Sequence, residues 1–223
     1  MSEWVIGRLL QVWKRFREAD AYQQDHKFER SYGRTFAGST IGIVGLGGIG
    51  QAVASRARAL GCRTLGLKRS AKPGDVSEHV DELFPREKLH ELLAQSDAVI
   101  ISAPATAQTH HMIDAAALAA MPRHAVLVNV ARGTLVDEVE LARVMRDEPL
   151  AAAVLDVFDP EPLDPTSPLW DLPNVYVSAH SSVSVDRYMD DVFALFLDNL
   201  ERFQNGRALR NEIDMKSLGF VAP

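Results

Sequence analysis

Three ionisable side chains stand directly after apolar segments, where a strand would end. Arg132 follows LVNVA, Glu161 lies in the proline-rich stretch after AVLDVF, and His180 follows NVYVSA. An arginine, an acid and a histidine at one edge of a sheet are typical of oxidoreductases that act on a carbonyl group, because they supply a cation, a proton donor and a partner for the imidazole. Taken singly, each has a simpler interpretation: a surface arginine, a solvated loop acid and a histidine that caps a strand.

One glycine-rich turn indicates a nucleotide site. The segment TIGIVGLGGIG ends in the spacing G-x-G-x-x-G at Gly45, Gly47 and Gly50. It follows an apolar strand and opens a helix (IGQAVASRARAL), which is the context that dinucleotide-binding turns require. The pyrophosphate would sit at the helix N-terminus, on the N–H groups of Gly48 and Ile49. A turn with a purely structural purpose is the alternative.

The end of the second predicted strand indicates which dinucleotide is preferred. NAD-binding domains usually carry Asp or Glu there, which binds the ribose 2′-hydroxyl. In this chain Lys68, 23 residues after Gly45, takes that place, and Arg69 and Ser70 follow. These side chains would bind a 2′-phosphate through charge-assisted hydrogen bonds. We therefore expect NADP or NAD as the cofactor, with NADP favoured; a solvated Lys–Arg pair is the alternative.

Apolar segments alternate with helical patterns along the chain, which predicts an α/β fold. Strands are expected at residues 40–45, 63–67, 97–103, 125–130, 151–157 and 175–178, and helices at 49–60, 86–94, 114–120, 138–147 and 185–204. Strands that are apolar on both faces and alternate with helices form a parallel sheet covered on both sides. The expected fold class is a doubly wound parallel sheet, a Rossmann-type dinucleotide-binding domain flanked by long helices. Ligands bind such sheets outside the carboxyl ends of the strands, where the residues above would meet.

The N-terminal segment predicts one amphipathic helix over residues 3–25. The side chains near one face of this helix are Trp4, Val5, Leu9, Val12, Trp13 and Phe16. Packing against the core would explain the apolar face. An interface helix is the alternative, because two exposed tryptophans are costly in water.

Charge and composition exclude several classes of protein. The net charge of −6 argues against a nucleic-acid partner, which needs a basic face. No run of 18 apolar residues is present, so we expect no membrane partner, and Glu3 comes too early for a signal peptide. The single cysteine, Cys62, excludes an internal disulfide and most cysteine metal sites. We therefore expect a cytoplasmic protein without a metal centre.

The order and spacing of these motifs resemble the D-isomer-specific 2-hydroxyacid dehydrogenases. The resemblance covers nearly the whole chain, through SEWVIGRLL, GIVGLGGIG, VNVARGTLVDE, LDVFDPEPL, PNVYVSAHSS and LRNEID. It implies an oxidoreductase that transfers a hydride between NAD(P)H and a small 2-oxo or 2-hydroxy acid, of the glyoxylate or hydroxypyruvate kind. It also implies a homodimer, because the nucleotide domains of this family dimerise.

The resemblance also implies roles for individual residues. Arg132 would hold the substrate carboxylate and polarise the carbonyl group, and His180 would protonate the carbonyl oxygen as general acid. Glu161 would pair with the imidazole and fix its tautomer, and Asp156 would hydrogen-bond the nicotinamide amide. With the glycine turn included, the expected cofactor contacts are Gly45, Gly47, Gly48, Ile49, Gly50, Lys68, Arg69, Ser70, Ala103, Pro104, Val130, Ala131, Arg132, Asp156 and His180.

Three features depart from the family. Its members resemble this chain only after a long N-terminal segment that forms most of a substrate-binding lobe. We therefore expect a dinucleotide-binding domain over residues 1–206 and a remnant of that lobe over 207–223, with a cleft open to water and weakened turnover. Lys68 replaces the usual acid, and Ser181 and Ser182 stand where apolar or small residues are usual.

Two other functions are therefore alternatives to an active reductase. The first is a truncated, catalytically weak module that binds nucleotide and dimerises, which the open cleft would favour. The second is a sensor of the co-repressor kind, which uses the same scaffold; no segment of the sequence supports it directly.

Overall fold

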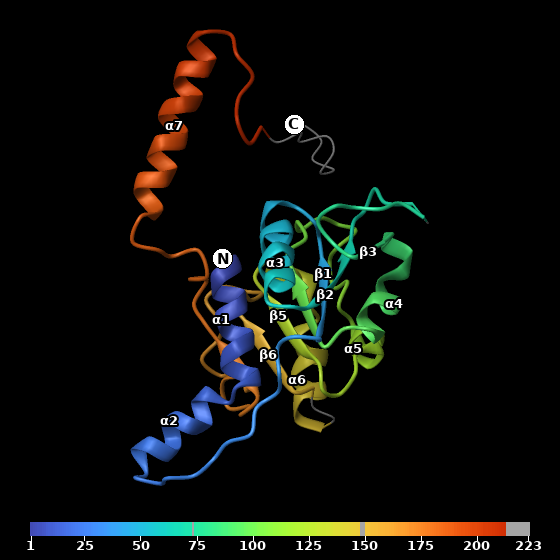
Figure 1. The fold of residues 1–223 in the computed structure, drawn as a ribbon, viewed down its shortest axis with the longest axis vertical. Helices are drawn as coiled ribbons and strands as arrows, with labels where there is room; N and C mark the ends of the chain where they lie inside the picture. Colours follow the sequence, from blue (N-terminus) through green and yellow to red (C-terminus); the bar gives the residue numbers. More distant parts are fainter. Residues whose placement is uncertain (73, 148–149, 213–223) are drawn as a thin grey trace. The chain divides into compact units, whose positions relative to one another are not determined.

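The computed structural model describes residues 1–72, 74–147 and 150–212, and its centre is a parallel sheet (Figure 1). Seven strands of these residues lie in the order β3-β2-β1-β4-β5-β6-β7, and each neighbouring pair is parallel. They are β1 (Thr40–Val44), β2 (Arg63–Leu67), β3 (Glu82–Phe84), β4 (Ala98–Ile101), β5 (Val126–Asn129), β6 (Ala152–Leu155) and β7 (Val175–Val177). The chain adds β2 and β3 on one side of β1 and the later strands on the other. The predicted doubly wound fold is confirmed.

Both faces of the sheet are buried, because successive side chains of a strand point to opposite faces. In β4, Ala98 and Ile100 belong to one buried cluster, whereas Val99 and Ile101 belong to the other. Strands β5 and β6 repeat this alternation. A polar side chain without a partner is costly on either buried face, so the ends of the strands are the favoured place for chemistry.

Helices cover each face of the sheet (Figure 1). Helices α1 (Ser2–Trp13) and α3 (Gly48–Ala59) pack with one apolar cluster, and α4 (Leu89–Ala94), α5 (Ala115–Ala120) and α6 (Glu138–Asp147) pack with the other. Short 3₁₀ turns lie at Arg86–Lys88, Gly133–Leu135 and Pro168–Trp170. Helices α2 (Phe16–Gln24) and α7 (Tyr188–Gln204) contribute no buried residue.

The six predicted strands are all present, and four of the five helices predicted after the glycine turn appear with ends shifted by at most three residues. The fifth, at residues 86–94, divides into a 3₁₀ turn and α4. Strand β3 is not among the predictions. It is three residues long at the sheet edge, and only Phe84 of it is buried, so it is too short to show an apolar period.

The prediction of one continuous helix over residues 3–25 is wrong. Helix α1 ends at Trp13 and α2 begins at Phe16, with Arg15 in the left-handed region at φ 57°. The N–H of Arg34 donates to the carbonyl of Trp13 at 2.6 Å. That carbonyl therefore bonds a segment distant in sequence instead of the next helical turn, and the chain changes direction.

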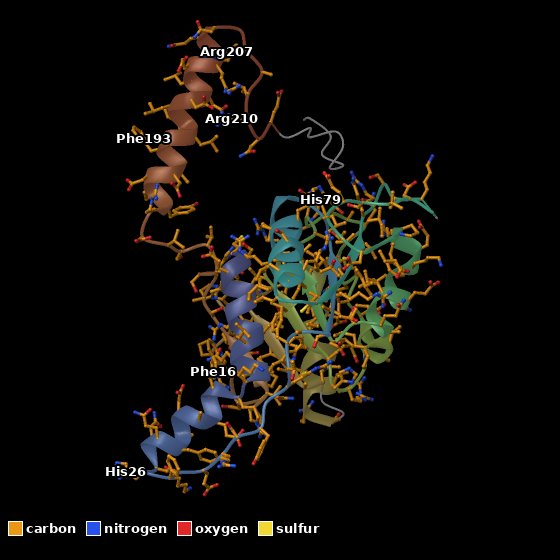
Figure 2. The ribbon with its side chains drawn as sticks, viewed as in Figure 1. Phe16, His26, His79, Phe193, Arg207 and Arg210 are labelled. Carbon is orange, nitrogen blue, oxygen red and sulfur yellow. The ribbon has the colours of Figure 1, made fainter. Side chains whose placement is uncertain are left out.

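The two tryptophans of α1 differ in burial, because Trp13 lies in the core and Trp4 is only partly buried. Trp13 is 4% exposed, and its ring meets that of Phe36 edge-on with centroids 5.0 Å apart. Core packing, the first interpretation of the apolar face, therefore holds for Trp13. The apolar residue on α2, Phe16, is half exposed and lies where the chain leaves the core (Figure 2).

The chain divides into two compact units, Met1–Ser182 and the residues from Val183 onward. All strands and all predicted site residues lie in the first unit. In the second, α7 exposes aromatic side chains such as Phe193 (Figure 2). The expected division at residue 206 stays a prediction, and most of the predicted tail, residues 213–223, lies outside the described residues. None of the described helices is long and apolar enough to span a bilayer.

Candidate active site

The glycine turn joins β1 to α3 through a backbone that only glycine adopts easily. Gly45 has φ +102°, and a Cβ at this position would lie 2.7 Å from the Cα of Ala103 in the loop after β4. A Cβ at Gly50 would collide with the carbonyl oxygen of Gly45. The first and third glycines of the motif therefore let the β1 and β4 loops and α3 pack closely. The same packing places Ala103 and Pro104 next to the turn.

The middle of the same turn is open. A Cβ added at Gly47 or Gly48 would meet nothing within 4 Å, and no side chain caps the N-terminus of α3. The first N–H groups of the helix, at Gly48 and Ile49, therefore face space that an anion can enter. This is the geometry that a pyrophosphate needs.

A hollow of about 420 Å³ lies at the end of β2, and Lys68 and Ser70 are among its lining residues. Two backbone hydrogen bonds hold the turn. The N–H of Lys68 donates to the carbonyl of Phe84, and the N–H of Ala71 donates to the carbonyl of Lys68. Asp75 also lines the hollow, and its carboxylate accepts from the N–H of Lys72 at 2.9 Å. The sequence predictions omit Asp75, which is too far along the chain to belong to the motif.

Arg132 stands on a turn that Asn129 organises. The Asn129 side chain is buried at the end of β5; its Oδ1 accepts from the N–H of Ala131 at 3.0 Å, and its Nδ2 donates to the carbonyl of Arg132 at 2.9 Å. The Arg132 guanidinium donates to the Ala131 carbonyl at 2.6 Å. The sequence predictions also omit Asn129; a polar residue inside an apolar strand is the signal that indicates it.

Asp156 is fully buried at the end of β6, and its carboxylate accepts three hydrogen bonds. Its Oδ1 accepts from the Ser178 hydroxyl at 2.6 Å and the Ser181 N–H at 2.9 Å, and its Oδ2 accepts from the Ser182 N–H at 2.9 Å. Burial alone would raise the pKa of this carboxyl, but the Ser178 hydroxyl and the two amides hold the pKa below its usual value. Asp156 thus binds the segment that carries His180.

His180 is presented by this segment in the left-handed conformation, with φ 48°. Its N–H donates to the carbonyl of Asp156 at 2.8 Å. Its Nδ1 lies 2.9 Å from Oε2 of Glu161, and the two side chains are 40% and 37% exposed. Because Nδ1 faces Glu161, Nε2 is the ring nitrogen left for another partner.

Glu161 links His180 to the loop after β6. Its second oxygen, Oε1, accepts from the N–H of Phe158 at 3.0 Å. Partial burial alone would raise its pKa, but the hydrogen bonds from His180 and Phe158 and the positive charge of Arg132 lower the pKa of Glu161. The structure therefore brings the three ionisable residues of the sequence prediction within electrostatic reach of one another.

An apolar hollow of about 460 Å³ adjoins the His180–Glu161 pair. Its other lining residues are Phe158, Pro162, Leu163, Trp170, Val177, Ser178 and Ala179. Val130 and Ala131, two further predicted cofactor contacts, are buried at the end of β5. All the predicted site residues thus follow the carboxyl ends of strands in the Met1–Ser182 unit.

Known proteins are similar to this chain in sequence. The family model described as "D-isomer specific 2-hydroxyacid dehydrogenase, NAD binding domain" matches residues 6–182. The chain is 37% identical over 207 residues to a glyoxylate reductase of Thermococcus gammatolerans, covering 89% of this chain and 61% of that protein. It is 33% identical over 221 residues to a glyoxylate reductase of Korarchaeum cryptofilum, covering 96% and 66%. The chain thus spans less than two thirds of either relative.

Solved structures share the fold. A D-isomer specific 2-hydroxyacid dehydrogenase family protein from Aeromonas salmonicida has a TM-score of 0.87 and 34% identity, covering 96% of this chain and 67% of its own. The NADPH-dependent glyoxylate/hydroxypyruvate reductase of Sinorhizobium meliloti, in complex with NADP and sulfate, has a TM-score of 0.86 and 32% identity, covering 99% and 69%.

The Asp156 contacts predict a loss of stability in Asp156→Asn. An amide in this place would point N–H groups at N–H donors and leave buried donors unpaired, which costs about 1–3 kcal/mol. The folded-state pKa lies below the unfolded value of about 4, so the stability from this carboxylate is complete above that pH and is lost as the pH falls through the folded-state pKa. The wild-type chain should therefore lose stability more steeply in acid than the variant.

Urea unfolding at pH 7 and in steps down to pH 3 measures both effects. Asp171→Asn, which replaces an exposed carboxylate, is the matched control and should change the free energy of unfolding by less than about 0.5 kcal/mol. Equal stability of Asp156→Asn and the wild type at pH 7 would contradict the role given to Asp156.

Proposed function

The chain belongs to the D-isomer-specific 2-hydroxyacid dehydrogenase family, and we propose that it transfers a hydride between NADPH and a small 2-oxo acid such as glyoxylate or hydroxypyruvate. The observation that carries the proposal is the His180–Glu161 pair, 2.9 Å apart and within electrostatic reach of Arg132. The names of the relatives, glyoxylate reductases and a glyoxylate/hydroxypyruvate reductase, support this class of substrate.

The residues of the chain divide the work of the reaction. A dinucleotide held by the glycine turn would supply, from its nicotinamide, the hydride that reduces the carbonyl carbon. His180 would hold a proton on Nε2 and donate it to the carbonyl oxygen as negative charge develops there. Glu161 would accept a hydrogen bond from Nδ1, so that it fixes the tautomer and the orientation of the imidazole. Arg132 would bind the substrate carboxylate and polarise the carbonyl group.

The described residues fit a dinucleotide with a 2′-phosphate. The open N-terminus of α3 suits the pyrophosphate, and Lys68 and Ser70 line the hollow at the end of β2, where a ribose would lie. The S. meliloti reductase is in complex with NADP, and a related dehydrogenase from Xanthobacter autotrophicus is in complex with NADPH. Asp75 lies at the same hollow, but its carboxylate already accepts a hydrogen bond from the backbone N–H of Lys72. These observations support a preference for NADP over NAD.

The exposure of the His180–Glu161 pair favours a second candidate function. With 40% and 37% of the two side chains exposed, water reaches the reacting groups. Exclusion of water and orientation of the substrate supply much of the barrier lowering in closed sites, about 7–11 kcal/mol for orientation alone. A nucleotide-binding and dimerisation module with little turnover is therefore the alternative.

We also propose a homodimer that acts in the cytoplasm. The sole cysteine, Cys62, is buried, and burial raises the pKa of its thiol to about 11, which makes it an unreactive core residue. Because Trp13 is in the core, an interface would use the exposed side of the N-terminal helices, including Phe16.

A purified chain of 24.6 kDa should have about twice that mass in solution if it is a dimer. Size-exclusion chromatography with light scattering at micromolar concentration measures the mass. A monomer under these conditions would contradict the proposal.

We predict that the chain oxidises NADPH in the presence of glyoxylate or hydroxypyruvate. His180→Ala should lower turnover by about 10²–10⁴, the usual contribution of a general acid. His90→Ala, an exposed histidine on α4, should leave turnover unchanged. Absorbance at 340 nm with a panel of 2-oxo acids is the measurement. No turnover from a folded chain that binds NADPH would favour the binding module.

The turn after β2 predicts tighter binding of NADPH than of NADH. Lys68→Glu should weaken NADPH binding about tenfold or more, because a charge-assisted hydrogen bond contributes about 1.5–3 kcal/mol. Lys88→Glu, in the 3₁₀ turn before α4, makes the same charge change away from the glycine turn. Fluorescence titration gives both dissociation constants. Comparable values for NADPH and NADH in the wild type would overturn the preference.

A further inference from the structure

The loops that carry Arg132 and Glu161 pack directly on each other. Gly133 follows Arg132, and a Cβ added to it would collide with the backbone of Phe158 and with the N–H of Asp159. The two loops follow adjacent parallel strands, β5 and β6. The position of one loop therefore determines the position of the other.

A carboxylate holds these two loops together. Glu138 is the first residue of α6, which follows the Arg132 loop, and its Oε1 accepts from the N–H of Asp159 at 2.9 Å. The preceding N–H, that of Phe158, donates to Glu161 at 3.0 Å. Two carboxylates thus bind neighbouring amides of one short segment, and the second of them continues to His180 at 2.9 Å.

The surroundings of Glu138 are unusual for an acid at a helix N-terminus. Burial and the negative charges of Asp159 and Glu161 raise the pKa of Glu138 to about 7. The hydrogen bond from the Asp159 backbone N–H acts in the opposite direction and only partly offsets this rise. An acid that served only the helix dipole would stand in water. Glu140, in the same turn of α6, differs from Glu138: its side chain is partly exposed, and its carboxylate accepts from Arg143 at 2.9 Å instead of from the loop.

We infer that Glu138 is a positioning residue of this site: its carboxylate fixes the Phe158–Glu161 segment against the Arg132 loop, so that Glu161 meets His180. The expected effect of Glu138 on turnover rests on the proposed function, whereas its expected effect on the position of the His180 imidazole does not. The charged groups around the segment are Glu138, Asp159 and Glu161, with Arg132 and His180 on the facing loops.

Glu138→Ala removes the acceptor, Glu138→Gln keeps an acceptor oxygen but removes the charge, and Glu140→Gln is the matched control. Two measurements separate the outcomes. Nitrogen NMR of the histidine rings and of the Asp159 amide, against pH, reports the Glu161–His180 contact without turnover. The pH profile of kcat and kcat/KM with NADPH and glyoxylate reports its effect on the reaction.

In Glu138→Ala we expect the Asp159 amide and the His180 ring signals to shift, and kcat to fall about 100-fold, the loss typical of a misplaced reacting group. In Glu138→Gln we expect turnover near that of the wild type, with the step near pH 7 absent from the pH dependence of the Asp159 amide. Glu140→Gln should match the wild type in every measurement.

The inference would be overturned if the His180 ring signals and the Asp159 amide signal of Glu138→Ala matched those of the wild type. If Glu138→Ala does not fold, an unchanged pH dependence of the Asp159 amide in Glu138→Gln would overturn it as well. Shifted ring signals in a chain whose wild type shows no turnover would support the positioning role and count against the proposed function alone.

Discussion

The burial of both faces of the sheet is the constraint on which the rest of this molecule depends. Burial extends to the carboxyl ends of β5 and β6, so a polar side chain there must find its partners within the protein. Asn129 and Asp156 are such residues, one at the end of each strand. Each is satisfied by groups of the turns that carry the reactive side chains, and those turns are therefore ordered by the core itself.

This arrangement explains how an exposed site can be well defined. The Asn129 side chain bonds the backbone of the turn at Ala131 and Arg132. The Asp156 carboxylate accepts from Ser178 before His180 and from the two serine amides after it. Glu161 then joins the second of these turns to the loop after β6. The imidazole and the guanidinium reach solvent, whereas Asn129 and Asp156, which order the turns that carry them, lie in the protein interior.

The fold and the edge of the site could be predicted from the sequence because they depend on local patterns. Apolar strands that alternate with helices imply a parallel sheet, and parallel strands deliver Arg132, Glu161 and His180 to the same edge. The remaining features depend on contacts between distant residues. The break in the N-terminal helix follows from Arg34 binding the carbonyl of Trp13, and the role of the serines after His180 follows from Asp156, 25 and 26 residues earlier. The residues of each contact are further apart in the sequence than the length of one helix or strand.

The backbone of His180 carries an evolutionary consequence. Its φ of 48° is one that glycine adopts freely and that costs a residue with a Cβ about 1 kcal/mol. Selection for thermodynamic stability alone would favour glycine at this position and would remove the imidazole. With a histidine here, the folded state gives up part of its stability to hold an imidazole ring in place. Stability and chemistry thus favour different residues at this one position. If the chain lost its catalytic role, we would expect the replacement of His180 by glycine to be the first substitution.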